Sequence, residues 1–158
     1  MTSEFASDEA GQFWRYIEST LDRLFEMVAA EPEDVLSWLP PAESPNSILV
    51  LARHMLANVE VNILGTLGGE LIEYDREAAF GDDITKADVL AHWSELRPHL
   101  QQTMADLPAD RISGLVKHHW RGEIPGREVL IVVARHTAEH LAHAELTRDM
   151  ALVATQAR

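Results

Sequence analysis

The chain has 158 residues, of which 46% are hydrophobic, and this size and composition suit a single domain, residues 1–158, with a sizeable core. The 26 acidic and 13 basic residues give a formal net charge of -13, and so acidic a surface argues against nucleic acid as the partner. There is no cysteine, so disulfides, thiolate metal sites and a cysteine nucleophile are excluded, and His, Asp or Glu must hold any metal.

The N-terminal stretch MTSEFASDEAG is acidic and lacks the basic-then-apolar pattern of a signal peptide. No uninterrupted run of about 18 apolar residues occurs, which is the length that a membrane-spanning helix needs. We therefore expect a cytoplasmic protein with no membrane segment.

Apolar residues recur at helical spacing in four stretches, which are separated by clusters of Pro, Gly and Asp. The first predicted helix covers residues 7–30 and ends where Glu31 precedes a proline. The second covers residues 45–67, with Ser44 as its N-cap and Gly68-Gly69 as its stop. Because this second helix is apolar almost all round, we expect it to be buried.

The third predicted helix covers residues 86–107, and Thr85 with Asp88 forms its capping pattern. The segment RISGLVKHHWRGEIPGR follows and predicts an irregular stretch or a small hairpin. The fourth helix begins after Gly126 and runs to about Ala154. Four helices of this length in one domain predict an all-α fold, a four-helix bundle.

The stretch RHTAEHLAHAELTRD, residues 135–149, holds three histidines. His136, His140 and His143 share one face of the fourth helix with apolar residues, on the stripe expected to meet the core. Two imidazoles four residues apart on a helix can converge on one metal ion. Core histidines bonded to carbonyls or carboxylates are the ordinary alternative, but for this pair we favour a metal, whose third ligand must come from elsewhere.

His54 is the best third ligand, because it lies well inside the most buried helix, where an unpaired imidazole is least tolerated. His92 and His99 share a face of the more charged third helix, and we interpret them as boundary residues. His118 and His119 precede a tryptophan in a loop, where solvated side chains are expected and a pocket mouth is the alternative.

Two known metal motifs do not fit. His136, Glu139 and His140 spell the H-x-x-E-H signature of one protease class, but that class takes its third ligand well downstream in a larger fold. Only 18 residues follow His140. A di-iron carboxylate bundle needs Glu-x-x-His on two helices, and no histidine here has a glutamate three residues before it.

A site of three histidines leaves a coordination position open for water or substrate, as in catalytic zinc sites. Such a metal lowers the pKa of bound water or of a thiol. Glu139 is a candidate general base or support for a ligand imidazole, and equally an ion-pair partner of Arg135 or His143. Asn58, one turn beyond His54, is a candidate pocket residue for a cofactor or a helix-contact residue.

Several segments together resemble the DinB superfamily, the DinB/YfiT-like four-helix-bundle metalloenzymes. They are FWRYIESTLDRL, PPAESPNSILVLARHMLANVE, the DREAAF loop and REVLIVVARHTAEHLAHAELTRDM, and the resemblance spans nearly the whole chain. It implies a four-helix bundle with a long crossing connection. It also implies a zinc or nickel site made by His54, His136 and His140, with His143 as a fallback ligand or pocket residue.

The resemblance further implies a small-molecule substrate and a homodimer. Characterised branches of the superfamily are thiol S-transferases that use mycothiol or bacillithiol, together with a maleylpyruvate isomerase. We therefore expect a metal-dependent enzyme of the thiol S-transferase or hydrolase kind. The alternatives are a non-catalytic metal- or ligand-binding bundle in a stress response, and a scaffold whose histidines only satisfy one another.

Overall fold

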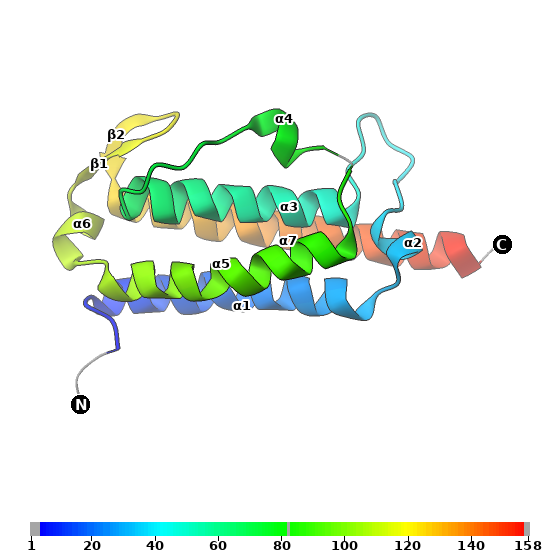
Figure 1. Cartoon of the computed structure of the whole chain (residues 1–158), viewed down its shortest axis with the longest axis horizontal. Coiled ribbons are helices and arrows are strands. Elements are labelled where there is room, and N and C mark those ends of the chain that lie inside the picture. Colours follow the sequence, from blue (N-terminus) through cyan, green and yellow to red (C-terminus); the bar gives the residue numbers. More distant parts are fainter. Residues whose placement is uncertain (1–3, 82, 157–158) are drawn as a thin grey trace.

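The computed structural model describes residues 4–81 and 83–156. Within them, the long helices are α1 (Asp8–Ala30), α3 (Ile48–Val59) with its π-helical continuation η1 (Glu60–Leu67), α5 (Lys86–Asp106) and α7 (Gly126–Gln156), shown in Figure 1. The short elements are α2 (Glu33–Leu36), α4 (Arg76–Ala79), α6 (Ala109–Ser113) and an antiparallel hairpin of β1 (Leu115–His118) and β2 (Gly122–Pro125). The predicted all-α four-helix bundle and the small hairpin are confirmed.

The long helices pack as a ring in which α1 and α3 each contact both α5 and α7. Helices α3 and α5 run in the same direction, so residues 68–85 travel back along the bundle to join them (Figure 1). This segment, which we name the crossing connection, carries the single turn α4. It is the long connection that the resemblance implied.

The core follows from the apolar spacing of α1 and from the apolar character of α3. In α1, Trp14, Ile17, Leu21 and Leu24 are at most 1% exposed and recur every three or four residues, which places them on one face. Helix α3 is buried on nearly all sides, because it packs between α5 and α7 and also contacts α1 and α4. The core of the bundle therefore forms where apolar faces such as that of α1 pack around the buried helix α3.

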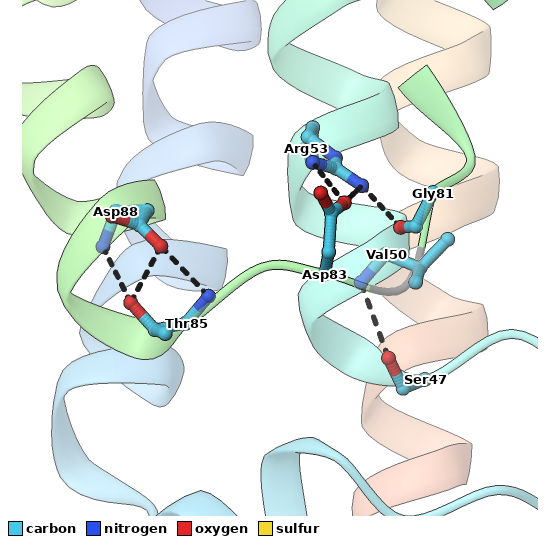
Figure 2. Close-up of polar contacts among 7 residues, drawn as sticks. All are labelled: Ser47, Val50, Arg53, Gly81, Asp83, Thr85 and Asp88. Atoms are coloured by element: carbon cyan, nitrogen blue, oxygen red, sulfur yellow. Dashed lines mark hydrogen bonds and ion pairs between the residues drawn. The ribbon is translucent and has the colours of Figure 1, made fainter. Parts of the chain in front are cut away.

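The second helix begins at Ile48, capped by Ser47, and the prediction that it begins at Pro45 with Ser44 as its cap was wrong. Ser47 is extended and its Oγ accepts from the Val50 N–H at 3.3 Å (Figure 2). Ser44 has φ 54, in the left-handed region, whereas an N-cap residue needs an extended backbone. Thr85 and Asp88, by contrast, form the predicted capping box at the start of α5 (Figure 2).

The sequence predicts one regular helix to Leu67, but its last two turns, Glu60–Leu67, are π-helical. Two side chains compete for carbonyls in this region: Asn62 Nδ2 donates to the Asn58 carbonyl at 2.9 Å, and Thr66 Oγ1 donates to the Val61 carbonyl at 3.2 Å. Side chains that occupy helical carbonyls favour alternatives to the regular ladder. Such π segments often lie beside functional sites, and this one begins six residues after His54.

The segment Ile48–Leu67 is long and apolar enough, with a mean hydropathy of 1.3, to cross a membrane on those two criteria alone. In the bundle, however, 78% of its most apolar window is buried. The apolar sequence is accounted for by its position as the core helix.

The pair His92–Glu60 joins α5 to η1 and predicts a pH dependence of stability. Its nitrogen and oxygen are 3.1 Å apart, and the hydrogen bond to Glu60 raises the pKa of His92 despite partial burial. A raised folded-state pKa stabilises the fold fully below the unfolded value of about 6.5, and this stabilisation is lost as pH rises through the folded pKa. We expect the melting temperature of the wild type to exceed that of His92→Gln by about 2 °C at pH 6 and by less at pH 8.5. Equal differences at both pH values would contradict this linkage.

Candidate metal centre

Three histidines from two helices meet in the middle of the bundle. His54 comes from α3, and His136 and His140 come from successive turns of α7. Each offers a ring nitrogen, and these three atoms all lie within 4.8 Å of one another. The structure therefore brings together the three residues that the sequence predicts as metal ligands.

The spacing of the rings fits a small divalent ion. The Nε2 atoms of His54 and His136 are 3.0 Å apart, and the ring centroids of His136 and His140 are 4.4 Å apart. Zinc–nitrogen bonds of about 2.0–2.1 Å in a tetrahedron place two ligand nitrogens roughly 3.3 Å apart, close to the observed separation. The Nδ1 atom of His136 is buried without a hydrogen-bond partner among the described residues, so Nε2 is the nitrogen that faces the other rings.

The electrostatics of the cluster favour neutral imidazoles, the form that binds metals. Burial, with the added repulsion of His140, His54 and Arg135, lowers the pKa of His136 to about 3. Burial also lowers the pKa of His140, and His143 adds to this effect while Glu139 opposes it. Both shifts favour the neutral ring, which leaves a nitrogen lone pair for a metal.

The other predicted site residues lie around the cluster at different depths. Asn58 is 8% exposed, and its Oδ1 atom is buried with no hydrogen-bond partner among the described residues. Glu139 is exposed and forms an ion pair with Arg135 at 3.4 Å. His143 is exposed too, with its ring stacked 6.3 Å from that of His140. Asn58 is thus a buried polar group one turn from a candidate ligand, whereas the side chains of Glu139 and His143 are exposed.

A pocket of about 510 Å³ opens beside the cluster. It is lined by His54, by Tyr74 and Phe80 of the crossing connection, and by His119 and Trp120 of the hairpin turn. The ring of Phe80 stacks on that of His54 at 4.2 Å, and Tyr74 meets Trp120 edge-on at 5.1 Å. His119 and Trp120 thus line a pocket, the alternative to a solvated loop.

The amino-acid sequence does not predict Tyr74 or Phe80 as pocket residues. The one signal for Phe80 was its place in the DREAAF segment that carries the resemblance. Nothing in the spacing of Tyr74 indicated a pocket residue, because the crossing connection has no long periodic element.

The remaining histidines do not join the cluster. His92 pairs with Glu60, and His99 pairs with Glu70 at 2.8 Å. His118 is buried, and its Nδ1 atom accepts from the backbone N–H of Trp120 at 3.1 Å. Burial lowers the pKa of His118, so its ring is neutral as well.

A second hollow of about 500 Å³ lies near the C-terminal end of α7, and its lining includes Trp38, Met150 and Val153. It is lined almost entirely by apolar atoms, and none of the clustered histidines reaches it. Its size therefore does not make it a reaction site. The pocket beside His54, by contrast, opens directly onto one of the clustered histidines.

A family model described as mycothiol-S-transferase matches residues 15–151, which include all three clustered histidines and the whole crossing connection. No curated protein matches the chain.

Proposed function

The chain belongs to the mycothiol-S-transferase family, within the DinB superfamily, and from this premise we propose that it is a metal-dependent thiol S-transferase. It would join the sulfur of a low-molecular-weight thiol, mycothiol in the first instance, to an electrophilic small molecule. The observation that carries the proposal is the convergence of His54, His136 and His140 beside a pocket of about 510 Å³.

The three imidazoles would hold a divalent ion, zinc or nickel, on the wall of this pocket. Such an ion lowers the pKa of a coordinated thiol, so that the sulfur is available as thiolate at neutral pH. Because the chain has no cysteine, the thiol must come from a separate molecule.

In this proposal the chain's own residues bind, orient and accept the proton. The aromatic side chains that line the pocket hold the substrates beside His54 and exclude water from them. Asn58 offers its buried Oδ1 atom as a hydrogen-bond acceptor toward the bound thiol compound. Glu139, one residue before His140, is the candidate acceptor of the thiol proton.

The proposed reaction is a substitution with a halogenated substrate and an addition with an epoxide. The thiolate sulfur forms a bond to an electrophilic carbon, and either a carbon–halide bond or a carbon–oxygen bond of an epoxide ring breaks. The electron pair of that bond leaves with the halide or the alkoxide, and the thiol proton passes to the base or onto the alkoxide.

The further expectations are a cytoplasmic enzyme and a homodimer. A buried core helix fits a soluble protein. Tyr16 on α1 and Ile131 on α7 are exposed and line a shallow apolar hollow together with Phe13, and this is the surface on which we expect the second copy.

The test is thiol consumption by metal-loaded and metal-free protein. Protein loaded with zinc or nickel is incubated with mycothiol, and with bacillithiol in parallel, together with a chlorinated aromatic or an epoxide. We expect the loaded protein to consume mycothiol at least about a hundredfold faster than the uncatalysed reaction, since enzymes reach far larger accelerations. Chelation should abolish this activity and added metal should restore it.

Stoichiometric metal without thiol consumption would instead favour a non-catalytic metal-binding bundle. Protein that binds no transition metal at all would leave only the scaffold interpretation, in which the histidines satisfy one another.

A further inference from the structure

Arg53 lies next to His54 on α3 but acts on a different part of the chain. Successive helix residues point about 100° apart, so the two side chains leave α3 in different directions. The guanidinium Nη2 atom of Arg53 donates to the carbonyl of Gly81, and Nη1 and Nη2 both lie 3.4 Å from Asp83 Oδ1 (Figure 2). Arg53 therefore binds the end of the crossing connection to α3.

The same stretch of the connection also covers the metal centre. Gly81 directly follows Phe80, whose ring stacks on His54. Two adjacent residues of α3 thus contact two adjacent residues of the connection. Arg53 binds the backbone carbonyl of Gly81, and His54 stacks on the ring of Phe80. A shift of the backbone at Gly81 would move Phe80 on its imidazole.

The two partners of Arg53 differ in what they contribute. The side chain of Asp83 is 90% exposed, so its ion pair adds little. The side chain of Arg53 is only 21% exposed, and its bond to a backbone carbonyl is shielded from water. The carbonyl bond is therefore the contact that fixes the connection, and the arginine fork binds the carbonyl and the carboxylate at once in a fixed geometry.

The position of the connection decides the shape of the pocket. Tyr74 and Phe80 of the connection supply one part of the lining, and His119 and Trp120 of the hairpin turn supply another. Among the described residues of the crossing connection, 68–81 and 83–85, the one-turn helix α4 is the only regular secondary structure. Fixing the end of the connection to α3 is thus a direct way to keep its part of the lining in place.

We propose that Arg53 is a positioning residue that holds the crossing connection closed over the candidate metal centre. It thereby keeps Phe80 stacked on His54 and keeps Tyr74 and Phe80 in place to contact the substrate. The kinetic part of this proposal rests on the proposed function, whereas the closure itself does not. Arg53 touches neither the clustered nitrogens nor the pocket, and it acts through Gly81 and Phe80.

The test uses the full chain with Arg53→Met, which keeps an apolar stem and removes the fork. Hydrogen exchange of metal-free protein is followed in peptides covering residues 70–85. We expect about tenfold faster exchange there than in the wild type, because one shielded charge-assisted bond is lost, and unchanged exchange in α1 and α5. Arg53→Lys, with one compact donor group, should restore part of the protection and serves as the milder variant if Arg53→Met folds poorly.

Two further readouts separate positioning from simple stability. Zinc-loaded Arg53→Met should release its metal to a chromophoric chelator about tenfold faster than the wild type, because Phe80 no longer shields His54. In the transferase assay, KM should rise about tenfold while kcat changes by less than about threefold. The matched control is Arg97→Met, the same substitution at an arginine whose ion pairs run to α1 instead of the crossing connection. It should leave the hydrogen exchange of residues 70–85, the rate of metal release and KM as in the wild type.

If residues 70–85 exchange hydrogen in Arg53→Met at the same rate as in the wild type, Arg53 does not hold the crossing connection in place. Faster exchange with unchanged metal release and unchanged KM would overturn its role in the site. If the wild type shows no transferase activity, the proposed function fails, and the exchange and metal-release measurements still decide the proposal on Arg53.

Discussion

His140→Ala is expected to lower the bound transition metal from about one ion per chain to below about 0.1, because two remaining imidazoles bind a divalent ion far more weakly than three. The effect on catalysis should be of the same kind: kcat/KM for thiol transfer is expected to fall at least about a thousandfold. Elemental analysis of protein purified without chelators measures the first quantity, and the mycothiol assay measures the second.

The matched control is His99→Ala. His99 is a half-exposed histidine that pairs with Glu70 outside the cluster, so its loss should leave the metal content unchanged. The same experiment on His54→Ala and His136→Ala should reproduce the loss seen for His140. A His140 variant that retains its full complement of metal would exclude this residue as a ligand.

Leu21→Ala is expected to lower the free energy of unfolding by about 2–5 kcal/mol, the largest effect on stability that we predict. Leu21 is 0% exposed on α1 and belongs to the core, so the substitution removes packed methyl groups and leaves a cavity. For a chain of this size the melting temperature should fall by roughly 5–15 °C. Thermal and chemical denaturation of the metal-free protein measure both quantities.

Leu146→Ala is the control for this core substitution. It has the same chemistry on a helix, but Leu146 is 61% exposed, so its loss should change stability by no more than about 0.5 kcal/mol. Equal losses for the two variants would mean that the α1 face is not the core that the structure describes.

The clustered histidines could be chosen from the sequence because two local rules mark them, helical spacing for the pair on α7 and burial for His54 on α3. His136 and His140 are one turn apart on a single helix, and the burial of His54 follows from the apolar residues on every side of it. The four long helices, the burial of α3 and the capping box at Thr85 could be predicted for the same reason, because each follows from residues close together in the sequence.

What the sequence could not supply depends on the local path of the backbone and on contacts that form only in the folded chain. The N-cap was misplaced because Ser44 and Ser47 both suit the role chemically, and only the turn of the backbone decides between them. The π-helix arises where side chains take backbone carbonyls, which no periodicity reveals. The pocket walls come from two loops, and Tyr74 meets Trp120 only after the bundle has formed.

The parallel course of α3 and α5 has a consequence for how this fold can diverge. Because the chain must return along the bundle between them, a segment of 18 residues, 68–85, lies over the metal centre without contributing any of its three clustered histidines. In the proposed function, the reactive centre and the surface that selects its substrates would therefore be encoded in separate stretches of sequence. If the proposed function holds, mutation can remodel this surface while the histidines stay fixed on their helices, which would let one chemistry serve many electrophiles.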